Sequence, residues 1–106
     1  QYSESLSLLN KILSLEPNDA YALYYRGMIY DTQKKYNEAI ADYKKAIELS
    51  PDLSIANYLI AIDYDTLGQY KNALPYYKTF TSNYAEQDEY LKYAQTRVGE
   101  LENNGK

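Results

Sequence analysis

The residue types that most often perform catalysis are missing from this chain. Its 106 residues include no Cys and no His, which removes thiolate chemistry and the commonest general base and metal ligand. Ser5 and Ser14 have no base near them in sequence, so serine catalysis has no support. Asp63 and Asp65 could share a metal ion in a loop, but on a helix they point about 200° apart. We therefore expect no enzyme, no metal site and no cofactor.

Tyrosine is the residue type that stands out, with 15 copies beside a single Phe and no Trp. Large amphipathic side chains of this kind are enriched where proteins bind other proteins. The net charge of −4 gives no reason to expect nucleic-acid binding, and no run of about 18 apolar residues predicts a membrane span. Gln1 is not a natural start, which indicates a processed or excised chain whose compartment stays unknown.

The segments that carry these tyrosines repeat every 34 residues, as the recurrence of Tyr30-Asp31-Thr32 at Tyr64-Asp65-Thr66 shows. Aligned without a gap, the two repeats share nine identities in 34 positions. We treat this duplication as real. We expect one repeat domain with four parts: the second helix of a truncated repeat at 1–19, full repeats at 20–53 and 54–87, and a C-terminal capping helix and tail at 88–106.

Each repeat contains two segments with apolar residues at helical spacing, separated by a short polar break. Asn37 is a plausible N-cap, and Gly68 is a plausible C-cap. The last four residues are expected to fray. The chain is therefore predicted to be all-α, with no strands and six helices at 2–16, 20–33, 37–49, 55–67, 72–83 and 87–102.

This period and the residues at its key positions resemble the tetratricopeptide repeat. The matching residues are Leu23, Gly27, Tyr30, Ala39, Tyr43, Ala46 and Pro51 in the first repeat and Ala61, Tyr64, Ala73 and Tyr77 in the second. The resemblance implies helix–turn–helix repeats that stack into a short right-handed superhelical solenoid and serve as a protein-binding scaffold. Arg26 stands where the family usually has Leu, and we expect it to pair with a carboxylate or a carbonyl.

The resemblance also implies a concave groove lined by the first helix of each repeat, in which a protein or peptide ligand binds. Spacings of three and four residues place the groove side chains on one helix face. We expect apolar anchors of the ligand to enter between the tyrosines and a basic residue to meet the aspartates. Alternatively, some of these tyrosines pack within the domain or touch a neighbouring repeat that is missing here. The expected partner-binding residues are Tyr21, Tyr24, Tyr25, Met28, Asp31, Ile55, Tyr58, Leu59, Ile62, Asp65 and Tyr93.

The first helix supports an alternative hypothesis, in which the chain is a structural self-assembly element. Its apolar residues spread over more than one stripe, which is typical of a helix that is buried on two sides. One side would pack on residues 20–33, and the other either met the missing upstream helix or pairs with a second copy of the chain. The residues concerned are Leu6, Leu8, Leu9, Ile12, Leu13 and Leu15.

Overall fold

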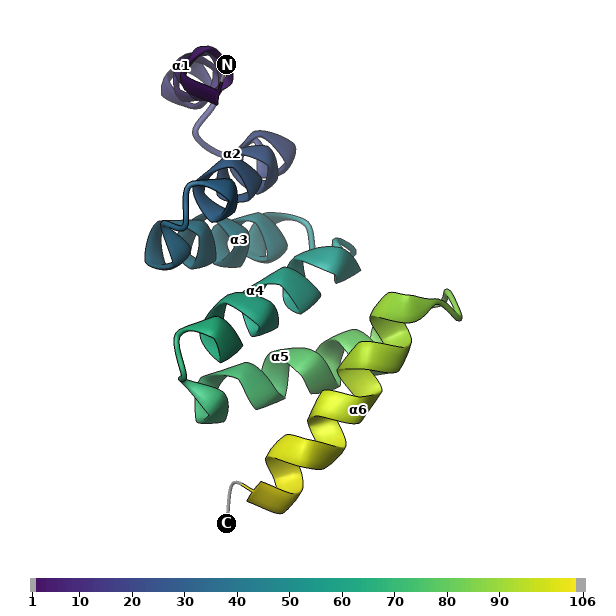
Figure 1. Cartoon of the computed structure of the whole chain (residues 1–106). Coiled ribbons are helices and arrows are strands. Elements are labelled where there is room, and N and C mark those ends of the chain that lie inside the picture. Colours follow the sequence, from purple (N-terminus) through teal and green to yellow (C-terminus); the bar gives the residue numbers. More distant parts are fainter. Residues whose placement is uncertain (1, 105–106) are drawn as a thin grey trace. The chain divides into compact units, whose positions relative to one another are not determined.

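The computed structural model describes residues 2–104, and in this range every regular element is an α-helix (Figure 1). The prediction of an all-α chain with six helices and no strands is confirmed for these residues. Gly105 and Lys106, half of the tail that was expected to fray, lie outside the described range. The helices are α1 (Tyr2–Leu15), α2 (Ala20–Thr32), α3 (Tyr36–Leu49), α4 (Ser54–Thr66), α5 (Tyr70–Asn83) and α6 (Glu89–Asn104).

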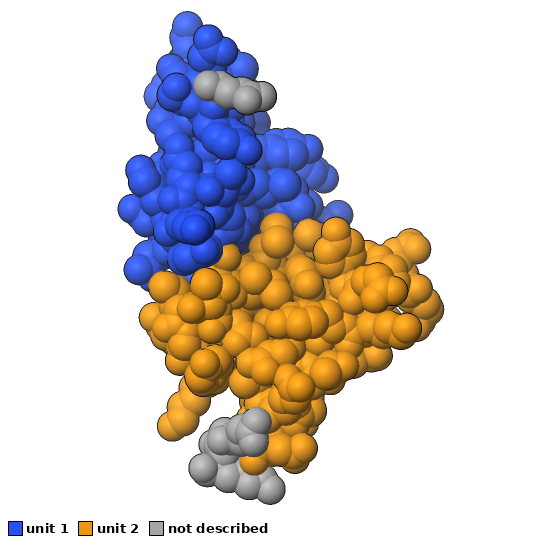
Figure 2. Space-filling model, in the orientation of Figure 1, with its two compact units in different colours: residues 1–53 blue, residues 54–106 orange. Residues whose placement is uncertain are grey.

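The chain forms two compact units that meet in sequence after Leu53, coloured blue and orange in Figure 2. The first unit holds α1, α2 and α3, and α2 packs against both of the others. The second unit holds α4, α5 and α6, and here α5 is the helix that packs against both others. Each unit therefore has its own three-helix core.

The core of the first unit combines large rings with very small neighbours. Tyr43 of α3 is fully buried, and its ring lies against Gly27 of α2 so closely that a Cβ there would be 2.6 Å from Cε1 of Tyr43. Ala39 and Ala46 on α3 are also fully buried. The absence of a side chain at Gly27 thus lets α2 and α3 approach each other.

The core of the second unit follows the same plan with a larger aromatic component. Tyr77 and Phe80 of α5 are fully buried beside Ala61 of α4 and Ala94 of α6. The ring of Tyr84, just after α5, stacks on Phe80 with the two ring centres 4.4 Å apart. Phe80 stands at the position that Ala46 occupies one repeat earlier, so this core contains an extra ring.

The helix starts correct two details of the sequence prediction. The residue before α3 is Lys35, whose side chain makes no capping hydrogen bond, and Asn37 lies inside the first turn, so the predicted Asn37 cap is wrong. Helix α5 begins at Tyr70, two residues earlier than predicted, which places Pro75 inside the helix rather than in its first turn. At α2, Asp19 does cap the helix by accepting the N–H of Ala22 at 3.0 Å.

Helices α2 and α4, the first helices of the two repeats, are both followed by a residue with a positive φ, but the residue types differ. After α4, Gly68 has φ +77°, the left-handed conformation that glycine adopts without strain, which agrees with the predicted C-cap. At the equivalent position after α2, Lys34 has φ 62°. A lysine there carries the steric cost that Gly68 avoids.

Candidate functional site

The predicted binding residues of the first unit all lie on α2, but they differ in exposure. Tyr21, Tyr25 and Met28 are 55%, 52% and 41% exposed, whereas Tyr24 and Asp31 are partly buried. Tyr24 rests on the ring of Tyr25, with centres 5.5 Å apart. The structure therefore leaves three large side chains of this helix open to solvent.

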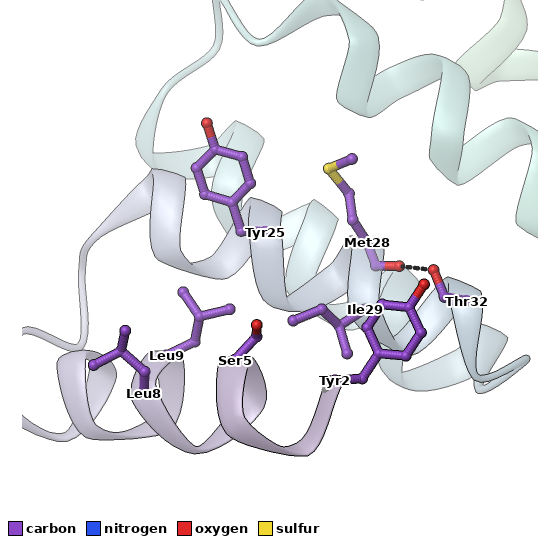
Figure 3. Close-up of a pocket in the computed structure, with 8 residues that line it drawn as sticks. All are labelled: Tyr2, Ser5, Leu8, Leu9, Tyr25, Met28, Ile29 and Thr32. Atoms are coloured by element: carbon purple, nitrogen blue, oxygen red, sulfur yellow. Dashed lines mark hydrogen bonds between the residues drawn. The ribbon is translucent and has the colours of Figure 1, made fainter.

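Two of these exposed side chains border an apolar pocket between α1 and α2 (Figure 3). The pocket has a volume of about 470 Å³, within the range of roughly 300–1,000 Å³ that is typical of ligand sites. In Figure 3, Tyr25 and Met28 project from α2, while the α1 side chains project toward α2. The lining residues are Tyr2, Ser5, Leu8, Leu9, Tyr25, Met28, Ile29 and Thr32.

The chemistry of this pocket favours apolar ligand groups. None of its eight lining residues is charged, and the hydroxyl of Thr32 is already engaged, since it donates to the carbonyl oxygen of Met28 at 3.0 Å. Sequence reasoning identified Tyr25 and Met28 but not the α1 half of the pocket. The available signal was the breadth of the apolar surface on α1, where Leu8 is 59% exposed.

The predicted binding residues of the second unit take part in a ring cluster. Tyr58 of α4 has its ring centre 5.1 Å from that of Phe80, 5.3 Å from Tyr90 and 6.4 Å from Tyr93. Burial raises the pKa of the Tyr58 hydroxyl, with smaller contributions from neighbouring tyrosines. Of the rings in this cluster, those of Tyr90 and Tyr93 are the exposed ones, at 52% and 45%. Ile55 and Ile62 pack on the core, and Leu59 is also partly buried.

Asp65 is held inside the second unit. Its Oδ1 accepts from a guanidinium nitrogen of Arg97 at 2.8 Å, and its Oδ2 accepts from Nε of Arg97 at 2.8 Å and from the Tyr77 hydroxyl at 2.7 Å. Burial and this hydrogen bond raise the pKa of Tyr77, and the bond to Asp65 raises that of Arg97. We expected Asp65 to pair with a basic residue of the ligand. In the structure, its carboxylate is instead paired with Arg97 of the same unit.

Asp31, the equivalent residue of the first unit, accepts a hydrogen bond from a core tyrosine, as Asp65 does. Its Oδ2 accepts from the hydroxyl of Tyr43 at 2.6 Å. Its Oδ1 is buried and has no hydrogen-bond partner among the described residues. Both aspartates therefore anchor a core tyrosine, a structural role that the sequence reasoning did not assign to them.

The expected ion pair of Arg26 is present. Its guanidinium donates to both carboxylate oxygens of Asp42, at 2.7 and 2.8 Å, and to the side-chain oxygen of Asn10 at 2.9 Å. Asp42 is buried, and its hydrogen bond raises the pKa of Arg26. Arg26 thus links α2 to α3 and α1, so it supports the helices that form the pocket.

The described residues were also searched for a metal site and for a membrane-spanning helix. Within residues 2–104, no group of three or more acidic, His or Cys side chains is arranged to hold a metal ion. Asp63, the other half of the Asp-x-Asp pair, is buried. In the same range, no helix combines the length and apolar character needed to cross a bilayer. The exposed tyrosines and the pocket of the first unit are therefore the strongest candidate site.

Comparison with known proteins gives a family match over one of the two repeats. A family model described as "Tetratricopeptide repeat" matches residues 20–53, the segment delimited above by the 34-residue period. No curated protein matches the chain significantly.

Solved structures share the fold over nearly the whole chain. YrrB, described as a TPR protein with an unusual peptide-binding site, is 25% identical with a TM-score of 0.84, covering 98% of this chain and 52% of YrrB. The TPR2B domain of yeast Sti1, in a pHsp70 complex, is 20% identical with a TM-score of 0.80, covering 96% of this chain and 83% of that one. PcrH, bound to the chaperone binding region of PopD, is 13% identical with a TM-score of 0.85, covering 99% and 81%. The chain thus spans about half of YrrB.

Proposed function

Since residues 20–53 are a tetratricopeptide repeat and the chain has the fold of that family, we propose that this protein is a non-enzymatic binding module. Its ligand is a peptide or helix of another protein. The observation that carries the proposal is the group of large side chains that α2 leaves exposed, Tyr21, Tyr25 and Met28. Exposed aromatic and methionine side chains give a surface large contact area at low entropic cost.

Each unit contributes its own exposed side chains to the proposed binding function: those of α2 in the first unit, and Tyr93 of α6 in the second. Apolar anchors of the ligand would pack between these rings. The charge preference is weaker than the aspartates alone imply, because Arg97 neutralises Asp65. We therefore assign the attraction for a basic ligand to Asp31 and to the net charge of −4, which acts at long range and is screened by salt.

YrrB, Sti1 and PcrH support the class of ligand rather than its identity. YrrB has an unusual peptide-binding site, and the other two structures are complexes with pHsp70 and with the chaperone binding region of PopD. These proteins share the fold of this chain and have polypeptide ligands, which supports the proposed class of ligand. The partner of the present chain must be found by experiment.

The test replaces exposed rings only, because changing the core-packed Tyr58 would also damage the fold. Peptides selected from a displayed random library against the native chain would be measured against a Tyr21→Ser/Tyr93→Ser variant. The control is Tyr70→Ser, since Tyr70 is 52% exposed but lies outside the groove. We expect about a tenfold or greater loss of affinity for the groove variant and no change for the control. Equal binding by all three would refute the groove.

A further inference from the structure

Three tyrosine rings, one from α4 and two from α6, lie together in the second unit. The ring centre of Tyr58 is 5.3 Å from that of Tyr90 and 6.4 Å from that of Tyr93. The rings meet nearly edge to face, at interplanar angles of 75° and 78°. Tyr58 is half-buried, whereas Tyr90 and Tyr93 are exposed. This tyrosine cluster therefore keeps much of its aromatic surface in contact with solvent.

The hydroxyl groups of the tyrosine cluster are available to a ligand. Among the residues that the structure describes, none forms a hydrogen bond with a hydroxyl of Tyr58, Tyr90 or Tyr93. By contrast, the hydroxyl of the neighbouring Tyr84 donates to Asp88 at 2.6 Å. The three oxygens of the cluster can therefore each accept a hydrogen bond from outside the protein.

The surroundings of the cluster are acidic. Burial raises the pKa of the Tyr58 hydroxyl, and the nearby tyrosines and the carboxylate of Asp88 raise it further. Glu86 and Glu89 flank Asp88 in sequence. Within residues 2–104, no ion pair involves any of these three carboxylates. A cationic group that approaches the rings would therefore meet negative charge that no basic side chain of the described part neutralises.

The combination of aromatic rings, hydroxyl oxygens and negative charge suits one kind of side chain, arginine. Its planar guanidinium stacks on aromatic faces and has five N–H donors for nearby oxygens. The first unit contains such a pair, since Cζ of Arg26 lies 5.7 Å from the centre of the Tyr30 ring. An aliphatic group would bury part of the cluster but leave its oxygens without hydrogen-bond partners.

The exposure of Tyr93 is a property of its position in the repeat. Tyr93 stands two repeat lengths of 34 residues after Tyr25 of α2. Helix α3 follows α2 and packs against it, yet Tyr25 is still 52% exposed. A helix that follows in the array thus leaves this position open, and the ring stays accessible to a ligand.

We propose that the tyrosine cluster of Tyr58, Tyr90 and Tyr93 binds an arginine side chain of the protein ligand. The guanidinium lies against the rings and donates to their hydroxyl oxygens, while Asp88 contributes the opposite charge. This inference rests on the proposed binding function and deepens it, because it names the residue type that the second unit recognises. The cluster thereby takes the role that the sequence suggested for Asp65.

The test uses three small probes that differ in one functional group. Nα-acetyl-arginine amide carries the guanidinium, Nα-acetyl-citrulline amide carries a neutral urea of nearly the same shape, and Nα-acetyl-lysine amide carries an ammonium. Each is titrated into the full 106-residue chain, and the tyrosine ring signals are followed by NMR. We expect the arginine probe to shift the signals of Tyr90 and Tyr93 with a Kd on the order of 1–10 mM, at least about fivefold tighter than the citrulline probe.

A ring variant locates the bound probe. Tyr93→Leu removes an aromatic face and a hydroxyl but keeps an apolar side chain beside its neighbours. We expect it to weaken binding of the arginine probe about threefold or more. Tyr70→Leu is the control, because Tyr70 is an exposed tyrosine of the same unit outside the cluster, and it should leave binding unchanged.

A charge variant tests the contribution of the carboxylate. Asp88 accepts the backbone N–H groups of Tyr90 and Leu91, and asparagine can also cap a helix in this way. Asp88→Asn should therefore preserve α6, as circular dichroism would verify, and weaken binding of the arginine probe about twofold. Asp19→Asn changes the corresponding cap of α2 and should have no effect.

Other outcomes would overturn the proposal. Equal binding of the arginine and citrulline probes, or no ring shift with any probe, would refute a cation site at the cluster. Equal binding of the lysine probe would show that the cluster selects positive charge and not the guanidinium. Unchanged binding by Tyr93→Leu would place the arginine elsewhere.

Failure of this proposal is distinguishable from failure of the proposed function. Library peptides that bind the native chain, lose affinity for Tyr21→Ser/Tyr93→Ser and tolerate citrulline in place of every arginine would uphold the function and refute the arginine site. Ring shifts with the arginine probe in the absence of any selected peptide would support the arginine site and contradict the proposed peptide ligand.

Discussion

A second helix of a repeat followed by a first helix occurs in both units, as α1–α2 in one and as α5–α6 in the other. In the second unit, α4 covers the surface that α5 and α6 form, and Tyr77 is fully buried. In the first unit, the corresponding surface of α1 and α2 stays open as the pocket beside Leu8 and Met28. Tyr25 and Tyr93, which correspond to each other, are exposed to a similar degree. The exposure of these two tyrosines therefore does not distinguish the two helix pairs. What distinguishes them is that α4 packs on the α5–α6 pair.

The two aspartates offer the strongest test of this comparison. Asp65→Ala removes a partly buried ion pair with Arg97 and the acceptor of the Tyr77 hydroxyl, so we expect it to cost about 3 kcal/mol of unfolding free energy. Asp31→Ala removes only the acceptor of Tyr43 and should cost about 1.5 kcal/mol. Urea denaturation followed by circular dichroism measures both. Equal costs would show that Arg97 adds nothing to the second unit.

The glycine that faces Tyr43 gives a second test. Gly27 and Ala61 occupy equivalent positions, but only Gly27 lacks room for a Cβ beside its tyrosine ring. We expect Gly27→Ala to lower the unfolding free energy by about 1–2 kcal/mol, since overpacking outweighs the better helix propensity of Ala. Gly99→Ala is the matched control, because nothing lies within 4 Å of its added Cβ, and it should be stabilising. A stabilising Gly27→Ala would contradict the close approach of α2 and α3.

The left-handed residues after α2 and α4 allow a smaller change in the opposite direction. Lys34→Gly should raise the unfolding free energy by about 1 kcal/mol, because glycine accepts the observed positive φ without steric cost. Gly68→Lys should lower it by a similar amount. Thermal or urea denaturation of the two variants would reveal the pair of opposite shifts, and two shifts of the same sign would refute this explanation.

The smallest expected effect is a pH dependence at the start of α6. The hydroxyl of Tyr84 donates to Oδ2 of Asp88 at 2.6 Å, which raises the pKa of Tyr84 from 10.0 to about 12 and lowers the pKa of Asp88. The stabilisation by Tyr84 is therefore complete below about pH 10 and is lost as the pH rises toward 12, while that by Asp88 is present above its unfolded pKa and is lost as the pH falls through its lower folded pKa.

Comparison of the native chain with Tyr84→Phe measures this effect. The difference in melting temperature between the two should be constant near neutral pH and should shrink above about pH 10. The exposed Tyr70→Phe serves as the control for general alkaline destabilisation. A difference that stays constant up to pH 12 would show that the hydrogen bond to Asp88 does not stabilise the folded chain.

Much of the fold could be predicted from the sequence because it depends on local periodicity. The 34-residue repeat, the helices found in residues 2–104 and the predicted C-cap at Gly68 all follow from the spacing and type of neighbouring residues. The candidate site was only half predictable. Tyr25 and Met28 were identified from α2, whereas Leu8 became a pocket residue only when α1 was placed beside α2.

By itself, the sequence determined a helical repeat, because the 34-residue period and the spacing of apolar residues act along the chain. Only the tertiary structure decided which aspartate is neutralised, since Arg97 stands 32 residues from Asp65 in sequence. It also decided which helix pair is covered and which is open. The physical reason is that burial and pairing depend on how helices pack against each other, and residues distant in sequence then meet at contact distance.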